Sequence, residues 1–301
     1  MITPRQLAVL TLLTLVWGLN WPVMKIGVTG YPPLSFRAWS MWFGLPLLGA
    51  ALLAMRVPFR VTRREWPQLA VLTVTNMLIW HVLVVLSVRE LSSGRAAILG
   101  FTMPIFSALW GRALFGQRLG ARQIAGVAGA AVGVALLLWH EMAHLAGRQW
   151  GAIGMLVAAA AWALGTQQLR HTTMTAPTLT LTFWMTAATT LVMTLLAALF
   201  EGSIWHLPPA SVQWAIAYNA VGVFAFAQAA WFYLARGLPP VASTLSVMLI
   251  PVLGTVSGAL WLHEVLYWQD AAAMVLMVGA IASVLWPERA TTRSVELSAE
   301  R

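Results

Sequence analysis

The chain has 301 residues, of which 60% are apolar and only 9% are charged. Soluble domains carry roughly 25% charged residues, so this composition excludes a water-soluble protein. The net charge of +9 comes mostly from arginines spread over many short polar segments, a distribution that disfavours a nucleic-acid-binding protein. The chain has no cysteine, which excludes disulfide bonds and thiolate metal sites.

Apolar stretches of about 17–23 residues, the length that crosses the hydrocarbon core of a bilayer, alternate with short charged segments along the chain. A transmembrane barrel would show short alternating strands instead, and the first stretch is too polar in its second half for a cleaved signal peptide. We therefore predict an all-α polytopic membrane protein with ten transmembrane helices. The expected spans are Gln6–Ile26, Leu34–Met55, Pro67–Val88, Ala96–Phe115, Arg122–Leu138, Gly151–Leu169, Leu179–Phe200, Val212–Ala235, Ala242–Leu262 and Ala271–Trp286.

Basic residues predict the orientation of these spans. With a cytoplasmic N-terminus, thirteen of the 18 Lys and Arg residues fall on the cytoplasmic side and five on the outer side, which satisfies the positive-inside rule. We expect both termini in the cytoplasm, with residues 288–301 forming a disordered cytoplasmic tail. The five basic residues counted on the outer side are Lys25, Arg37, Arg89, Arg95 and Arg148.

The sequence repeats itself weakly. Residues 89–119 and 236–266 align without a gap at an offset of 147, which matches Pro104 with Pro251. Near the start of each half, VWGLNW aligns with AWALGT at an offset of 145. These matches predict two copies of a five-helix unit.

We expect the two copies to occupy residues 1–140 and 141–287. An odd number of spans per copy turns the second copy upside down. Inverted repeats of this kind are typical of secondary transporters, in which the substrate site lies near the midplane between the halves.

Three segments carry a resemblance to a known family: VWGLNWPVMK in the first span, LSSGRAAILGFTMPIFSALWGRALFGQRL through the fourth, and LPPVASTLSVMLIPVLGTVSGALWLHEVL through the ninth. They resemble the drug/metabolite transporter superfamily, in its ten-helix EamA-type branch. The resemblance covers nearly the whole chain and implies a bacterial inner-membrane exporter of metabolites, amino acids included. One position departs from the family pattern, because Gln117 stands where an acidic residue usually follows the fourth span, whereas Glu264 is kept in the second copy.

The first span contains polar and helix-loosening residues at membrane depth. Trp17, Asn20 and Trp21 share one helical face, and Gly18 and Pro22 lie beside it as candidate hinge residues. Polar groups within a membrane usually face the bundle interior or a wet cavity, so we assign Trp17 and Asn20 to substrate binding. The alternative is an interfacial tryptophan belt and a helix–helix hydrogen bond, which stays open, above all for Trp21.

A second candidate set lies on the third and eighth spans. His81 aligns with Gln228 in the repeat, and both are polar residues in apolar surroundings. Asn76, Trp80 and Trp231 lie on the same two spans. We expect these five residues to face a shared cavity, although a histidine bonded to a neighbouring helix remains the alternative. Trp162, the repeat equivalent of Trp17, is the matching candidate on the sixth span.

Hydroxyl side chains gather at the start of the ninth span, where Ser243 and Ser246 are candidate substrate ligands. Pro251, and Pro104 in the fourth span, each free a backbone carbonyl, and freed carbonyls in transporters bind charged groups. We assign both prolines to hinges. Helix kinking without ligand contact is the alternative.

One motif points elsewhere. HEMAHLAGRQW, residues 140–150, contains the HExxH pattern of zinc proteases, but Trp150 stands where the third histidine of the extended form belongs. The segment lies between the two copies, and no other pattern completes a site. We therefore expect no metal site, no cofactor and no enzymatic activity.

Tryptophans suggest the substrate. The chain has 17 of them, and those in mid-span offer flat apolar walls and cation–π contact to an ammonium group. No basic cluster of the kind that sugar phosphates need is evident at mid-depth. We expect export of neutral or aromatic amino acids by a monomer or weak homodimer in the bilayer. A lipophilic-cation drug exporter, and a non-transporting scaffold or receptor, remain the alternatives.

Overall fold

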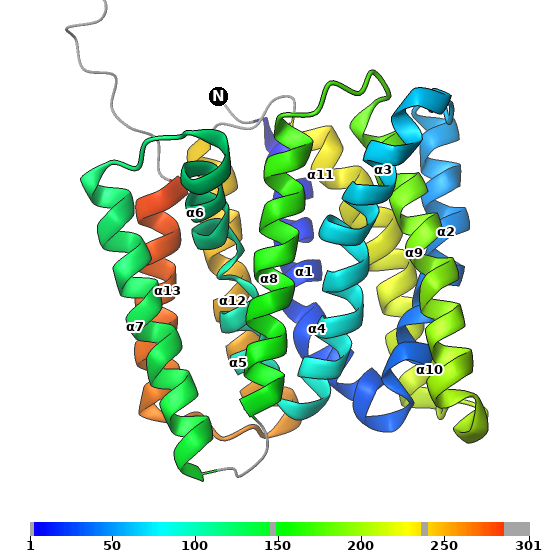
Figure 1. Ribbon diagram of the computed structural model, residues 1–301. Helices are drawn as coiled ribbons and strands as arrows, with labels where there is room; N and C mark the ends of the chain where they lie inside the picture. Colours follow the sequence, from blue (N-terminus) through cyan, green and yellow to red (C-terminus); the bar gives the residue numbers. More distant parts are fainter. Residues whose placement is uncertain (1–2, 145–148, 236–239, 286–301) are drawn as a thin grey trace, which may run out of the picture.

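The computed structural model describes residues 3–144, 149–235 and 240–285, and the side chains at 140–144, 232–233, 235, 240–247 and 284–285 lie outside the described set. Every regular element in the described ranges is a helix, and together these helices pass ten times through the fold (Figure 1). The first five passes are α1 (Pro4–Gly30), α2 (Pro33–Ala54), the third pass of η1 (Arg63–Glu65), α3 (Trp66–Leu72), η2 (Thr73–Leu78) and α4 (Ile79–Glu90), the fourth pass of α5 (Ser93–Gly100) and α6 (Met103–Phe115), and α7 (Ala121–His144).

The second half repeats this order. Within the described residues, eight helical stretches are long and apolar enough to cross a membrane, and α12 and α13 contribute two shorter apolar stretches. The prediction of an all-α fold with ten passes is confirmed. The elements are α8 (Gln149–Arg170), α9 (Thr178–Glu201) with η3 (Gly202–Ile204), the eighth pass of α10 (Ala210–Tyr218), η4 (Asn219–Ala227) and α11 (Gln228–Ala235), then α12 (Pro240–Leu262) and α13 (Trp268–Leu285).

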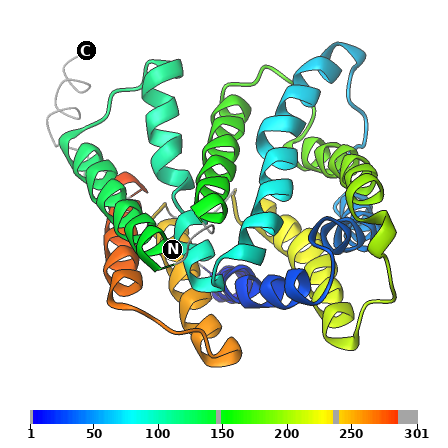
Figure 2. The same ribbon diagram turned by 60° about the horizontal axis from the view of Figure 1, so that its bottom comes forward.

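The helix ends form two faces of the bundle, the terminal face and the far face. The terminal face is the side on which α1 begins at Pro4 and α13 ends at Leu285, at the top of Figure 1. The far face is the opposite side, with the turns at 31–32, 91–92, 202–209 and 263–267. In Figure 2 the far-face ends of the helices come forward.

The two halves are inverted with respect to each other. Equivalent helices α7 and α13 lie side by side (Figures 1 and 2), with Gly126 against Ser283 and Gly133 against Ala273. The numbers rise along α7 as they fall along α13, so the two helices are antiparallel. Equivalent helices that run in opposite directions define an inverted repeat.

The α2–α9 pair repeats this arrangement in the other part of the bundle. Trp42 on α2 donates an indole hydrogen bond to Thr194 on α9 at 2.8 Å, and Gly49 faces Phe183. Here too the residue numbers run in opposite directions. The same pseudo-twofold axis between the halves therefore relates the two helices of each pair.

The third pass of each half contains a π-helical segment, η2 and η4. Each segment carries an asparagine, Asn76 and Asn219. Asn76 donates its amide to the backbone oxygen of Trp162 at 3.1 Å, and the amide oxygen of Asn219 accepts a hydrogen bond from Arg37 at 3.3 Å. π-Helical turns often occur at functional sites, and the apolar pattern of the sequence did not predict these two.

The two passes that carry the repeat-equivalent prolines Pro104 and Pro251 differ. The fourth pass breaks at Phe101–Thr102, and Pro104 lies in the first turn of α6, where its missing N–H costs no helical hydrogen bond. The equivalent Pro251 lies inside the continuous helix α12. The two halves therefore follow the same path, but only the fourth pass is broken next to its proline.

Close packing between α7 and α13 depends on small residues, and this dependence is testable. A Cβ at Gly126 would clash with Ser283 and Ala280, whereas a Cβ at Gly129 meets no atom within 4 Å. Overpacking a helix interface costs about 1–3 kcal/mol. We expect Gly126→Leu to lower the melting temperature of the purified protein by several degrees, and Gly129→Leu to leave it unchanged or slightly raised. Equal destabilisation by both variants would contradict the assigned interface.

Candidate functional site

Two tryptophan pairs join the halves. The rings of Trp17 on α1 and Trp231 on α11 lie 5.8 Å apart, and those of Trp80 on α4 and Trp162 on α8 lie 5.4 Å apart. Each pair connects the first pass of one half with the third pass of the other. All four side chains are half-buried. The structure thus brings four of the predicted binding residues into two aromatic contacts, each of which joins the two halves.

Polar atoms near these rings remain unsatisfied. His81 is 7% exposed, and its Nδ1 has no hydrogen-bond partner among the described residues; the same holds for Oδ1 of Asn20. The His81 ring lies 5.4 Å from the ring of Phe224. Gln228, its repeat equivalent, is half-buried at the start of α11. Leaving a buried polar group without a partner costs about 1–3 kcal/mol, so these atoms are available to a polar solute.

Asn76 is engaged differently from the other candidates. Its amide binds α8 through the backbone oxygen of Trp162 and through Thr166 Oγ1 at 3.3 Å. A Cβ added at Gly165 would clash with Asn76, so the two helices meet tightly at this point. In the described conformation Asn76 connects helices, and its role toward a substrate stays a prediction.

The candidate hinge residues of the first span lie in an unbroken helix. α1 continues through Gly18 and Pro22. A Cβ at Gly18 would meet Leu253 of α12 at 2.6 Å, which gives this glycine a packing role. The hydroxyl candidates Ser243 and Ser246 lie outside the residues whose side chains are described.

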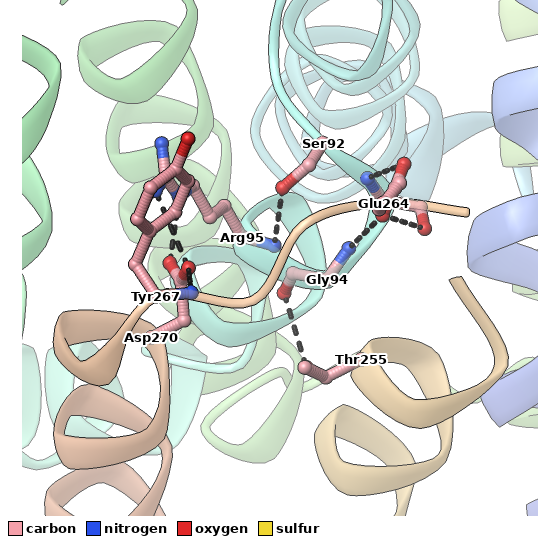
Figure 3. A network of polar contacts seen from close by, with 8 residues as sticks. Ser92, Gly94, Arg95, Thr255, Glu264, Tyr267 and Asp270 are labelled. Carbon is pink, nitrogen blue, oxygen red and sulfur yellow. Dashed lines mark hydrogen bonds and ion pairs between the residues drawn. The ribbon is translucent and has the colours of Figure 1, made fainter. Parts of the chain in front are cut away.

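A carboxylate links the two halves at the far face. Glu264, in the turn after α12, accepts hydrogen bonds at the start of α5 from the Ser93 backbone at 2.7 Å, the Ser93 hydroxyl at 2.8 Å and the Gly94 backbone at 3.3 Å (Figure 3). The first N–H groups of a helix lack partners within the helix and favour negative charge. Glu264 therefore ties the second half to the fourth pass of the first.

A buried ion pair lies next to this contact. Arg95 Nε is 2.6 Å from Asp270 Oδ1, and the side chains are 7% and 3% exposed. Asp270 also accepts from the Tyr267 backbone at 2.9 Å, and the Arg95 guanidinium lies 5.4 Å from the Tyr267 ring centre (Figure 3). Arg95 comes from the first half and Asp270 from the second, so this pair is a second connection between the halves.

Two further charges hold helix ends on the same face. Lys25 donates to the backbone oxygens of Val88, Arg89 and Leu91 at 2.8–3.0 Å, where α4 ends. Glu201 accepts from the backbone N–H groups of Leu34 and Ser35 at 2.9 and 2.7 Å, where α2 begins. Basic groups favour helix C-termini and acidic groups favour N-termini.

The terminal face lacks the means to repeat the Glu264 contact. Gln117 is the repeat equivalent of Glu264, and Pro240 is the equivalent of Ser93. Gln117 has no charge, and a proline has neither the N–H nor the hydroxyl that Ser93 donates. In the structure Gln117 instead contacts Gln167 of α8 at 3.4 Å. The Glu264 contact of the far face therefore has no repeat equivalent on the terminal face, where Glu65 instead accepts a hydrogen bond from Thr175 of the other half.

Sequence reasoning missed this set of charges. Lys25, Arg37 and Arg95 were counted as outer-side charges that set topology, whereas the structure buries Arg37 and Arg95 to 2% and 6% exposure within the bundle. Their signal was present as single basic residues inside apolar runs, close to the start of α2 and α5. The substitution of Gln117 for an acidic residue was noticed, but its partner at the helix start was not.

The Glu264 contact predicts a measurable bias toward a closed far face. Replacing the carboxylate in Glu264→Gln removes the charge from the hydrogen bonds at α5, which we expect to cost the closed state about 1–2 kcal/mol, a factor of 5–30 in population. In a Thr255→Cys background, beneath the contact, labelling by a polar thiol reagent from the far side should accelerate several-fold. Glu90→Gln, which removes an exposed carboxylate from the same face, is the matched control. Equal labelling rates in both variants would contradict the bias.

Comparisons with known proteins agree with this architecture. The model of the EamA-like transporter family matches residues 6–139 and again 149–286. The chain is 26% identical over 274 residues to an uncharacterized inner membrane transporter, YedA, of Escherichia coli strain K12, covering 90% of this chain and 88% of that one. It is 26% identical over 261 residues to a probable terminal-alkyne amino-acid exporter of Streptantibioticus cattleyicolor, covering 85% of each.

A solved crystal structure of a protein that is 22% identical superposes with a TM-score of 0.66, covering 93% of this chain and 97% of that one. At this identity the superposition supports the fold. The two matches of the family model coincide with the two five-helix halves and together span nearly the whole chain. The chain is a multi-pass membrane transporter, not an enzyme, and it belongs to the EamA-like transporter family of the drug/metabolite transporter superfamily.

Proposed function

We propose that the chain exports neutral amino acids, with a preference for large or aromatic ones, by alternating access between its two halves. The observation that carries this proposal is the placement of two tryptophan pairs, each joining the two halves, with the unsatisfied atoms of Asn20 and His81 on the helices that carry Trp17 and Trp80. Aromatic walls favour flat apolar side chains and contact an ammonium group through cation–π interaction. The name of the Streptantibioticus relative, an amino-acid exporter, supports the same substrate class.

The direction of transport follows from the proposed topology. Most arginines in loops lie on the terminal face, so the positive-inside rule makes this face cytoplasmic, with both termini there. The far face, where Glu264 and the Arg95–Asp270 pair link the halves, then faces outward, and we propose that these contacts hold it closed. Such a conformation would load its substrate from the cytoplasm. Both halves of the path come from one chain, so we expect a monomer, or a weak homodimer, to be functional.

A lipophilic-cation exporter is the second candidate, because the same tryptophan pairs offer aromatic contact to organic cations. Such a transporter usually needs a carboxylate at membrane depth. Among the described residues the acidic side chains lie at the ends of helices, as Glu65, Glu90, Glu201, Glu264 and Asp270 do. This placement favours a zwitterionic or neutral solute.

The cavity assignment predicts a labelling pattern. Single cysteines at Trp17, His81, Trp162 and Gln228, introduced into this naturally cysteine-free chain, should react with a polar thiol reagent, because we expect these positions to line a water-accessible path. Leu191→Cys, at an exposed apolar position of α9, should face lipid and stay unlabelled. Added phenylalanine should slow the reaction at the four sites. If none of the four reacts, with or without phenylalanine, the path lies elsewhere.

The transport assay tests both substrate and coupling. Reconstituted protein should equilibrate phenylalanine across liposomes without any ion gradient, because no described carboxylate lies at mid-depth to carry a proton. We expect only a weak pH dependence, through His81, and its loss in His81→Ala. Absence of amino-acid flux would favour a scaffold or receptor, and flux of a lipophilic cation alone would favour the second candidate. Several-fold accumulation driven by a pH step and abolished by a protonophore would contradict gradient-driven export.

A further inference from the structure

Two arginines are buried near the far face of the bundle, and only one of them has a carboxylate partner among the described residues. Arg95 forms an ion pair with Asp270 at 2.6 Å. Arg37, on α2, is 2% exposed, yet no carboxylate oxygen of the described residues lies within ion-pair distance of it. An arginine stays protonated in proteins, and a charge within a membrane is costly and usually functional. Arg37 therefore carries a buried positive charge that the described chain does not balance.

The contacts of Arg37 are with neutral groups. Its Nη1 donates to Asn219 Oδ1 at 3.3 Å and its Nη2 to Met24 Sδ at 2.7 Å. The guanidinium lies 5.6 Å from the centre of the Phe224 ring. Its Nε is buried and has no hydrogen-bond partner in the described part of the chain. These groups orient the guanidinium and leave both its charge and one donor unsatisfied.

The acidic residues in the described ranges are committed elsewhere or exposed. Glu201 and Glu264 receive the N–H groups of α2 and α5, and Asp270 receives Arg95. Glu65 accepts from Thr175 on the terminal face, and Glu90 is exposed. A counter-charge for Arg37 is thus more readily supplied by a solute than by these side chains.

The position of Arg37 connects it with the proposed path. Phe224 contacts both the Arg37 guanidinium and the His81 ring, which lies 5.4 Å away. Met24 of α1, His81 of α4 and Asn219 of η4 surround this point, so elements from both halves meet there. When the far face opens, these elements separate and the guanidinium becomes accessible.

We propose that Arg37 is the residue that binds the carboxylate of the exported substrate, on the far side of the tryptophan pairs. This inference rests on the proposed function, in which the substrate is an amino acid. Arginine presents parallel N–H donors that match a carboxylate, and Nε and one terminal nitrogen form such a fork. The tryptophans contact the other end of the solute. Arg37 thereby confers specificity for an acid over its uncharged amide.

The experiment compares phenylalanine with phenylalaninamide, which differ at the carboxylate alone. Equilibrium binding is measured by tryptophan fluorescence with the full chain in lipid nanodiscs. We expect the wild-type protein to bind phenylalanine at least tenfold more tightly than the amide. Arg37→Gln should reduce this preference to less than twofold by weakening phenylalanine binding alone, and Arg37→Lys should keep part of it. Arg89→Gln, which removes an exposed charge from the same face, should leave the preference unchanged.

The outcomes distinguish a failure of the Arg37 assignment from a failure of the proposed amino-acid export. Unchanged amide binding by Arg37→Gln also demonstrates that this variant is folded. Equal weakening of both ligands, or an unchanged preference in Arg37→Gln, would overturn the assignment and leave amino-acid export standing on the wild-type data. If Arg37→Gln does not fold, Arg37→Lys decides, because a structural arginine predicts an unchanged preference in any folded variant. Absence of phenylalanine binding by the wild-type protein would overturn the proposed function and the assigned carboxylate together.

Discussion

The arrangement of the bundle depends on how charges meet helix ends on the far face. Glu264 and Glu201, both from the second half, receive the unpaired N–H groups that begin α5 and α2 in the first half. At a membrane boundary these groups would otherwise need water or a polar lipid group. The same residues therefore satisfy the backbone and fix the two halves against each other. Since each contact crosses between the halves, the far face cannot open without exposing those N–H groups.

The inverted repeat explains why the candidate path is symmetric while its two ends are not. Trp17 and Trp162 are repeat equivalents, and each contacts a tryptophan on the third pass of the other half, Trp231 and Trp80 respectively. The same relation would bring Gln117 to the start of α12, yet there the residues differ from their counterparts on the far face. Two halves that share a backbone path but differ at their end contacts prefer one conformation over the other.

The ten passes and their repeat were predictable from the sequence because they depend on local patterns. Length and apolarity define the spans, and the offset of 147 residues aligns Pro104 with Pro251. The partner of each tryptophan was not predictable, because Trp80 and Trp231 differ by 151 positions and fall outside the repeat offset. The helix breaks before Pro104 but not at Pro251, and Gly100, just before the break, packs closely against Trp21. Such tertiary contacts leave no periodic signal in one sequence.

Charges were hardest to interpret from the sequence, since a single arginine in an apolar run satisfies the positive-inside count and a buried role equally well. Arg37 and Arg95 were both counted as outer-side charges, and both are buried, Arg37 without a carboxylate partner in the described chain and Arg95 paired with Asp270. The repeat alignment does distinguish the far face from the terminal face at one charged contact. Glu264 meets Ser93, whereas their equivalents Gln117 and Pro240 offer neither a negative charge nor a backbone donor. The charged contact of Glu264 therefore ties the two halves at the far face, and its repeat-equivalent residues do not form the same contact at the terminal face.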